Sequence, residues 1–216
     1  MSLFARNTRQ LGERLILRQA PLAPVAAVIL LPGGHADGLQ PPPRMDLAAL
    51  RMRPFSSAVL RAVRPRPVCI ACVTYRRKGW NGAHADAARY AHTALADIRE
   101  HAGDIPIILI GHSMGGRAAL RVAGDPAVRG VVALAPWCPP GDPVDHLTGR
   151  RLFLLHDEAD RVTSAQESWN FIHRARAVGA DAVGIRMPAG GHTMLRRAGL
   201  WHRQAAYLVA QLLDDP

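Results

Sequence analysis

The sequence predicts an α/β protein, a three-layer α/β/α sandwich in which a mostly parallel, twisted sheet carries helices on both faces. Short apolar runs alternate along the chain with longer segments whose apolar residues recur every three or four positions. The runs are apolar throughout, which is typical of strands buried on both faces of a parallel sheet. Because 216 residues suffice for one such domain, we expect residues 1–216 to form a single domain.

The expected strands are an outer strand and six buried runs. They are residues 14–18, and then 25–31, 68–75, 105–110, 130–135, 152–156 and 182–187. Helices are expected over 83–101, 114–123 and 164–178, and at the end of the chain. A further helix after the proline-rich segment 40–43 is expected in two parts, broken near Pro54. The connection from 135 to 152 is short and proline-rich, so we expect no cap domain.

The charge balance is strongly basic, with 27 Lys and Arg against 17 Asp and Glu, a formal net charge of +10. Lys78 is the only lysine, and the arginines are scattered rather than clustered with aromatic residues. We therefore expect no nucleic-acid partner. The longest uncharged apolar stretch, residues 19–34, is too short for a membrane span and contains prolines. These features favour a cytoplasmic protein with no membrane partner.

Three cysteines are too few for a disulfide framework and fit a reducing compartment. Cys69 and Cys72 have C-x-x-C spacing but lie inside a predicted strand, where residues three apart point to opposite faces. We interpret them as two core thiols. No His, Cys or carboxylate cluster has metal-ligand spacing, so no metal and no organic cofactor is expected.

The strongest chemical signal is Gly111-His112-Ser113-Met114-Gly115, a G-x-S-x-G motif between an apolar strand and a helix. In that context the serine occupies a strained strand-to-helix turn with its hydroxyl above the sheet. Side chains at the two glycine positions would collide with neighbouring backbone. The N–H groups of the following helix point to the place where negative charge develops on an attacked carbonyl. The motif predicts Ser113 as a nucleophile.

A serine hydroxyl needs a base. Sites of α/β sheets form beyond the carboxyl ends of the strands, and His192 follows the last predicted strand in a loop with two glycines. His112 lies within the turn and is interpreted as packed there, whereas His156 ends a strand and is interpreted as a solvated or packed histidine. His192 is the predicted general base.

Three carboxylates, Asp157, Glu158 and Asp160, follow the strand at 152–156. Asp160 is far enough beyond the strand to curl back toward a histidine, whereas the other two are expected to serve the turn or face solvent. The residues themselves leave the choice of acid open. The predicted chain order is Ser, Asp, His.

An oxyanion hole needs two N–H donors. One is expected from Met114, after the nucleophile, and the other from Gly34 in the glycine turn after the strand at 25–31. A simple chain reversal is the alternative for that turn. His35, Trp80 and Trp137 are candidates for binding substrate, although each tryptophan would equally suit edge packing.

These residues resemble the α/β-hydrolase superfamily over nearly the whole chain. The segment 111–116 is similar to its nucleophile elbow, and Gly191-His192 to its catalytic histidine. Residues 31–34 are similar to its His-Gly-x oxyanion turn, with Pro32 where histidine is common. Residues 156–160 resemble its His-Gly-x-x-Asp motif, with Asp157 where glycine is common. The resemblance favours Asp160 as the acid.

Within the superfamily the chain is similar to small lidless members, such as the dienelactone-hydrolase-like and carboxylesterase or thioesterase groups. The resemblance implies two-step hydrolysis of a small-molecule ester or thioester through an acyl-enzyme. Acyl transfer or amide cleavage on the same residues is an alternative. A non-catalytic binding protein on a hydrolase scaffold is another, but such a protein usually loses one of the three catalytic residues.

Overall fold

The structure is a computed structural model, and it describes residues 9–12, 15–43 and 45–214. Its strands are β1 (Arg9–Leu11), β2 (Leu15–Gln19), β3 (Ala26–Leu31), β4 (Val68–Val73), β5 (Ile107–His112), β6 (Val128–Leu134), β7 (Arg151–His156) and β8 (Asp181–Arg186). Its α-helices are α1 (Leu47–Ala62), α2 (Asp86–Ala102), α3 (Met114–Val122), α4 (Ala165–Ala177) and α5 (Ala198–Asp214). Two short 3₁₀ helices cover Gly82–His84 and Asp145–Leu147.

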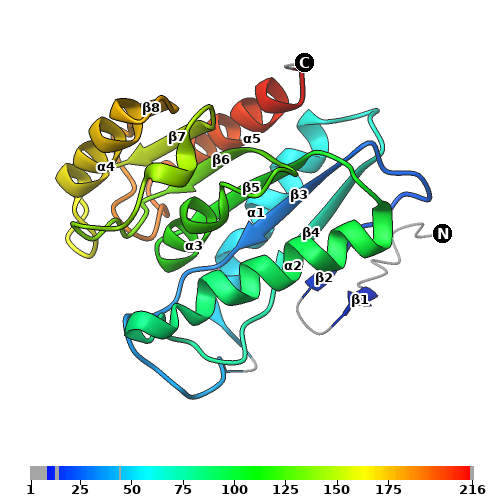
Figure 1. Cartoon of the computed structure of the whole chain (residues 1–216), viewed down its shortest axis with the longest axis horizontal. Helices are drawn as coiled ribbons and strands as arrows, with labels where there is room; N and C mark the ends of the chain where they lie inside the picture. Colours follow the sequence, from blue (N-terminus) through cyan, green and yellow to red (C-terminus); the bar gives the residue numbers. More distant parts are fainter. Residues whose placement is uncertain (1–8, 13–14, 44, 215–216) are drawn as a thin grey trace.

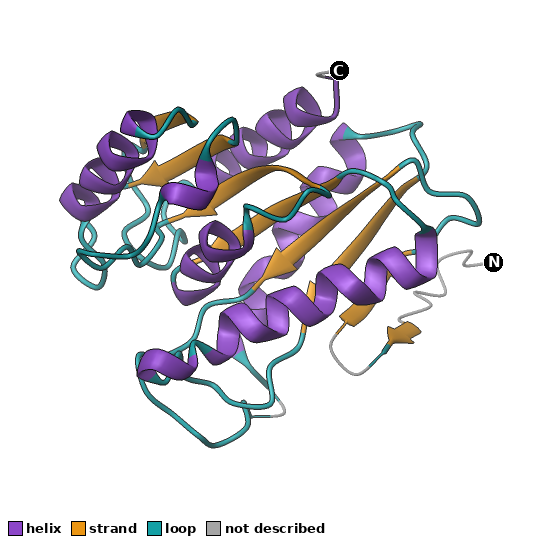
Figure 2. Ribbon diagram, in the orientation of Figure 1, coloured by secondary structure: helices purple, strands orange, loops and turns teal. Residues whose placement is uncertain are grey.

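The described strands form one eight-stranded sheet in the order β1-β2-β4-β3-β5-β6-β7-β8. β1 and β2 are antiparallel to their neighbours, and the pairings from β4 to β8 are all parallel. Figures 1 and 2 show the twisted sheet between its helices. The three-layer, mostly parallel α/β/α sandwich predicted from the sequence is confirmed. The structure adds one edge strand, β1, that the sequence did not indicate.

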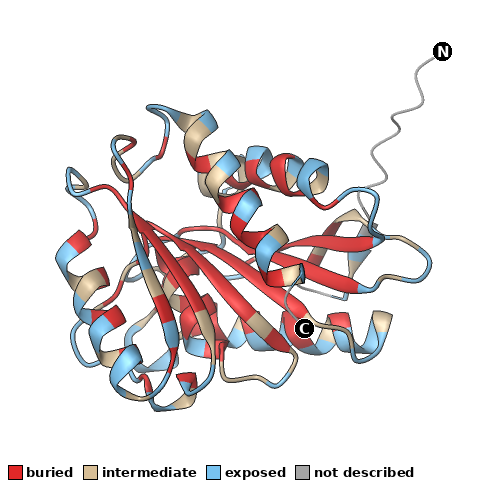
Figure 3. Cartoon of the chain, turned by 90° about the horizontal axis from the view of Figure 1, so that it is seen from above, coloured by how far each residue is buried: buried red, intermediate tan, exposed pale blue. Residues whose placement is uncertain are grey.

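Two apolar cores lie on opposite faces of the sheet. Helices α2, α3 and α4 pack on one face, and α1 and α5 pack on the other. Alternate residues of β3 serve the two cores, Ile29 facing α2 and α3 while Val28 and Leu30 face α1 and α5. Figure 3 shows the sheet as a buried layer between the two helical layers. Strands covered on both faces need the continuous apolar runs seen in the sequence.

Helix α1 differs from the prediction because it runs unbroken through Pro54. A proline inside a helix removes one backbone hydrogen bond and costs about 3 kcal/mol. Met52 and Phe55, on either side of the proline, are each 1% exposed in the core under α1 and α5. Packing of these side chains against the sheet offsets the cost of the proline. Pro54 itself is exposed.

The outer strand begins at Leu15, since residue 14 lies outside the described residues. Cys69 and Cys72 are free and buried in opposite cores, as two core thiols should be. Burial raises the pKa of Cys69 to about 11 and that of Cys72 to about 12. Within the described part of the chain, no helix is long and apolar enough to cross a membrane.

The parallel strands bring the candidate site residues to one edge of the sheet. The loops after β3, β5, β7 and β8 all leave the carboxyl ends of their strands at that edge, where sites of such sheets form. The connection between β6 and β7 contains only the short helix Asp145–Leu147. The described residues therefore contain no inserted cap between these two strands, as expected.

Candidate active site

Ser113 stands between the end of β5 and the start of α3, in a strained backbone conformation with φ 54° and ψ −118°. A positive φ is costly for a residue with a side chain and persists only where the surroundings impose it. Hydrogen bonds from the N–H groups of Arg117 and Trp137 to the Ser113 carbonyl, both 3.1 Å, hold the turn. Ser113 is 7% exposed, so most of this residue is buried within the turn.

The motif requires glycine at positions 111 and 115, because a Cβ atom at either position would clash with neighbouring backbone. A Cβ atom at Gly111 would lie 2.2 Å from the carbonyl oxygen of Gly115. A Cβ atom at Gly115 would lie 2.2 Å from the carbonyl oxygen of Leu31, at the end of β3. Real Cβ atoms do not approach backbone so closely. The steric reason inferred for the motif is therefore confirmed, and it ties the elbow to the neighbouring strand.

His192 reaches the serine from the loop after β8. Its Nε2 lies 3.0 Å from Ser113 Oγ. The glycines at 190 and 191, with φ 141° and 54°, let this loop fold back over the sheet. The elbow holds the loop in turn, because His112 Nε2 lies 2.9 Å from the carbonyl oxygen of His192. Ser113 and His192 are thus placed in the geometry of a nucleophile and its base.

Asp160 completes the arrangement. Its Oδ2 lies 2.9 Å from His192 Nδ1, and its side chain is fully buried. Its Oδ1 accepts the backbone N–H groups of Val162 and Thr163, at 2.7 and 3.1 Å. Burial alone would raise the pKa of this carboxyl, but hydrogen bonds from two histidines and two backbone N–H groups hold the pKa well below its usual value. Asp160 is therefore an oriented carboxylate anion.

The two other candidate carboxylates, Asp157 and Glu158, contact different groups. Asp157 is 6% exposed and accepts the N–H groups of Ala159 and Gly191, at 2.9 and 2.7 Å. Glu158 is exposed and pairs with Arg186 on β8 at 2.9 Å. The sequence left open which of the three carboxylates is the acid. The geometry favours Asp160, since its side chain is the one in contact with His192.

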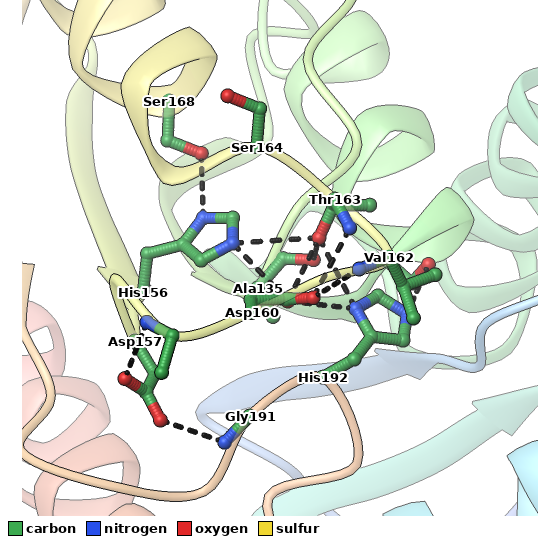
Figure 4. A network of polar contacts seen from close by, with 12 residues as sticks. Ala135, His156, Asp157, Asp160, Val162, Thr163, Ser164, Ser168, Gly191 and His192 are labelled. Carbon is green, nitrogen blue, oxygen red and sulfur yellow. Dashed lines mark hydrogen bonds and ion pairs between the residues drawn. The ribbon is translucent and has the colours of Figure 1, made fainter.

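Thr163 and His156 belong to the same network, and no role was predicted for either from the sequence, although His156 opens the segment that resembles the His-Gly-x-x-Asp motif. Thr163 Oγ1 lies 3.0 Å from Asp160 Oδ2, 3.1 Å from His192 Nδ1 and 3.2 Å from the Ala135 carbonyl oxygen. His156 Nε2 lies 3.2 Å from the same oxygen of Asp160. Figure 4 shows the two histidines on either side of Asp160, with Thr163 beside them. For Thr163 the only sequence signal was its position within a few residues of a candidate acid.

His112 is 1% exposed, and its Nδ1 has no hydrogen-bond partner among the described residues. Burial lowers the pKa of His112 to about 3. A neutral ring protonated at Nε2 fits both facts, because Nε2–H donates to the His192 carbonyl and Nδ1 is left as a bare lone pair. His112 is thus a packed histidine, as expected, and it also supports the loop of His192.

The glycine turn after β3 lies directly beside the elbow. A Cβ atom at Gly33 would lie 3.4 Å from Ser113 Cβ, and one at Gly34 would lie 2.3 Å from Met114 Cε. Tyr75 donates from its hydroxyl to the Pro32 carbonyl at 3.0 Å and fixes the start of the turn. The Met114 N–H belongs to the first turn of α3, where N–H groups lack intrahelical acceptors. Gly34 therefore lies against the Met114 side chain, beside the elbow.

Trp80 links the expected substrate-binding residues, because its backbone N–H donates to the His35 carbonyl at 2.9 Å. Trp80 and Trp137 come together around Arg117, whose guanidinium carbon lies 3.9 and 4.4 Å from the two ring centroids. Asp142 holds Arg117 through two hydrogen bonds of 2.7 Å. Trp80 is 3% exposed, whereas Trp137 is partly exposed. His35 is exposed next to Gly34, and its N–H donates to the Lys78 carbonyl at 2.9 Å.

A hollow of about 530 Å³ adjoins the acid loop and the start of α4. It is lined by Asp160, Arg161, Val162, Thr163 and Trp169 among others, but not by Ser113 or His192. Among the described residues, no group of three or more His, Cys, Asp or Glu is arranged to hold a metal ion.

The fold and the Ser113–His192–Asp160 geometry define a protein of the α/β-hydrolase class. Residues 28–214 match the Alpha/beta hydrolase family, and the chain belongs to this family. No curated protein sequence matches the chain.

Solved structures with the same fold include a lidless α/β serine hydrolase from Xanthomonas campestris. It is 15% identical with a TM-score of 0.63, over 94% of this chain and 90% of that one. An α/β hydrolase from a Medee basin deep-sea metagenome library is 15% identical with a TM-score of 0.71, over 96% of each chain. A thermophilic esterase from Thermogutta terrifontis, solved with propionate bound, is 16% identical with a TM-score of 0.67, over 92% and 88%. At these identities the likeness establishes the fold.

Proposed function

We propose that this protein is a serine esterase or thioesterase, with Ser113 as nucleophile, His192 as general base and Asp160 as the acid that orients it. The observation that carries the proposal is the unbroken chain of contacts from Ser113 Oγ to His192 Nε2, at 3.0 Å, and from His192 Nδ1 to Asp160 Oδ2, at 2.9 Å. Each contact is within hydrogen-bond reach, which nucleophile activation requires.

In the first step Ser113 Oγ attacks the carbonyl carbon of the substrate, and His192 Nε2 takes the hydroxyl proton. The N–H groups of Gly34 and Met114 hold the carbonyl oxygen as it becomes negative. His192 then gives its proton to the leaving alcohol or thiol, which departs and leaves the acyl group on Ser113. Asp160 remains ionised throughout and stabilises the protonated imidazole.

In the second step a water molecule attacks the acyl-enzyme with His192 again as base, and the released products are a carboxylic acid and free Ser113. The reaction is complete with protein groups and water. The small lidless fold and the short-acyl ligands of the Thermogutta terrifontis esterase, propionate in one structure and butyrate in another, favour small acyl substrates. Trp137 and His35 are the proposed walls of the substrate site.

A fluorophosphonate probe tests the nucleophile, because only an activated serine reacts quickly with it. Wild-type protein should be labelled at Ser113 and should hydrolyse members of a panel of ester and thioester substrates of graded chain length. Ser113→Ala should lose both labelling and turnover. Ser57→Ala, at an exposed serine on α1, is the matched control and should keep both. Labelling that persists in Ser113→Ala would overturn the assignment.

A further inference from the structure

Asp160 Oδ2 is contacted by two histidines. His192 Nδ1 lies 2.9 Å from this oxygen, and His156 Nε2 lies 3.2 Å from it. His156 comes from the end of β7, and its side chain is 0% exposed. Figure 4 shows the two rings on opposite sides of the carboxylate. The catalytic steps proposed above use His192 but leave His156 without a role.

The contacts decide where the proton of His156 lies. A carboxylate only accepts hydrogen bonds, so the nitrogen that faces Asp160 must carry a hydrogen. The other nitrogen, Nδ1, lies 2.8 Å from Ser168 Oγ on α4. If the Ser168 hydroxyl donates to Nδ1, both contacts are satisfied by a neutral ring protonated at Nε2.

The alternative partner of the Ser168 hydroxyl is weaker. Cys138 Sγ lies 4.0 Å from Ser168 Oγ, at the limit of a sulfur hydrogen bond. A hydroxyl that donated to this sulfur would need a hydrogen on His156 Nδ1 as well, which would make the ring an imidazolium. An imidazolium inside a fully buried site is costly, and the 2.8 Å contact is much the shorter.

We propose, on the basis of the function proposed above, that His156 is a positioning residue for the catalytic acid. Its Nε2–H donates to Asp160 Oδ2 and orients the carboxylate toward His192, while Ser168 fixes the tautomer of His156. A neutral donor orients Asp160 without cancelling its negative charge. The full charge thus remains available to stabilise His192 when it takes the proton of Ser113.

The hydrogen bond from His156 to Asp160 should affect the pH dependence of kcat/KM. A carboxylate that accepts fewer hydrogen bonds is more basic, so it holds the proton of a neighbouring imidazolium more strongly. Loss of the His156 donor should therefore move the acid limb of the kcat/KM profile to higher pH. The other titratable groups that face this cluster are His112 from β5, Asp157 from the loop after β7 and Cys138 from the loop after β6. All three are unchanged in the variants below.

The first test reads the tautomer directly in the wild-type protein. A long-range ¹⁵N–¹H NMR spectrum, assigned by comparison with His156→Gln, distinguishes the two neutral tautomers from the imidazolium. We expect the hydrogen-bonded His156 ring to be the neutral tautomer that is protonated at Nε2. An imidazolium, or a ring protonated at Nδ1, would overturn the proposal. This measurement does not depend on catalysis.

The second test uses variants and the kcat/KM profile. His156→Phe keeps a ring but removes the donor, and we expect kcat to fall about 10- to 100-fold, within the range for loss of a hydrogen bond to a charged group, with the acid limb moved up. His156→Gln keeps an N–H donor and should restore the limb to its wild-type position. His146→Gln is the control, because His146 is partly buried and bonded to the Leu120 carbonyl away from this site. It should leave the profile unchanged.

Ser168→Ala covers the case in which His156→Phe fails to fold. It removes one oxygen atom and frees the tautomer, so the limb should move in the same direction by a smaller amount. The proposal would be overturned if the acid limb stayed at its wild-type position in folded His156→Phe. If His156→Phe is unfolded, an unmoved limb in Ser168→Ala would overturn it. Fluorophosphonate labelling of wild-type Ser113 distinguishes that result from a failure of the serine mechanism, because only the latter would abolish labelling of the wild-type protein.

Discussion

The carboxylate of Asp157 accepts the backbone N–H of Gly191 at 2.7 Å, and so ties the loop after β7 to the loop that carries His192. Asp157 precedes Asp160 by one turn, and the Asp160 N–H donates to the Asp157 carbonyl at 3.0 Å. One turn of chain thus carries two buried carboxylates. One holds the backbone beside His192, and the other contacts its ring.

Because the two carboxylates contact different groups, the amide substitutions at Asp160 and Asp157 should lower kcat by different amounts. Asp160→Asn should lower kcat by about 10³- to 10⁴-fold, because an amide favours the wrong tautomer of His192. Asp157→Asn retains one acceptor oxygen and should cost about tenfold at most, as expected for a group that does not contact the reacting residues. Glu158→Gln, at an exposed ion pair, is the control. The measurement is kcat on one good ester, with circular dichroism to check folding.

The opposite ranking, with Asp157→Asn crippled and Asp160→Asn nearly normal, would show that Asp160 is not the acid. The serine mechanism itself would survive that result, because Ser113 and His192 would still face each other.

The turn after β3 gives a second prediction. A Cβ atom at Gly34 would lie 2.5 Å from the Lys78 carbonyl oxygen as well as against Met114, so Gly34→Ala must displace the turn. If Gly34 supplies one oxyanion donor, kcat should fall by about 10²- to 10³-fold, the usual cost of losing one donor. KM should change much less, because the contact strengthens in the transition state.

Gly199→Ala is the matched control for this change. A Cβ atom at Gly199, in the first turn of α5, would meet only the end of the flexible Arg203 side chain, at 3.3 Å. Steady-state kinetics of both variants decide the question, and a normal kcat in folded Gly34→Ala would remove Gly34 from the oxyanion hole.

The turn that holds Ser113 was predictable because its signal is local. Strand, turn and helix follow one another in a single segment, and the glycines at 111 and 115 are dictated by contacts with adjacent backbone. The same reasoning finds continuous apolar strands, because a parallel sheet covered on both faces constrains every residue of a strand.

The contacts of Thr163 were not predictable, because they depend on how separate segments meet. Thr163 touches residues from the loops after β6, β7 and β8. No pattern within one segment encodes such a meeting. Helix α1 is a related case, since the proline signal was local and the packing of Phe55 that outweighs it comes from α5 and the sheet.

The third prediction concerns stability and pH. His112 is neutral in the folded protein down to a pKa of about 3, whereas its ordinary value is 6.5. As the pH falls from 6.5 toward 3, the unfolded chain therefore binds a proton that the folded protein does not. The free energy of unfolding should decrease over that range, by up to about 1.4 kcal/mol per pH unit for this group.

His112→Gln should flatten this dependence, because glutamine keeps a donor for the His192 carbonyl but does not titrate. Urea unfolding of both proteins between pH 6.5 and 4.5 measures it. The range stops there because the lowered pKa of Asp160 adds a further loss of stability below about pH 4, where the unfolded carboxyl is protonated. Parallel curves for the two proteins would contradict the buried neutral histidine.

The last prediction separates the two tryptophans that flank Arg117. Trp80 is 3% exposed, and its indole lies under the guanidinium, so it is a packing residue first. Trp80→Ala should lower the free energy of unfolding by about 3 to 5 kcal/mol, the usual cost of emptying a buried aromatic site. Trp137 is partly exposed, and its backbone N–H donates to the Ser113 carbonyl, so the backbone of this residue lies next to the proposed nucleophile. Trp137→Ala should raise KM for the longer esters of the panel more than for the shortest, by about 10-fold or more per lost apolar contact, as for other apolar pockets.

Thermal unfolding and KM across the ester panel, measured on both variants, distinguish the two roles. If Trp137→Ala leaves KM unchanged for every chain length, the indole packs against Arg117 without binding substrate, and the wall of the acyl site must come from elsewhere.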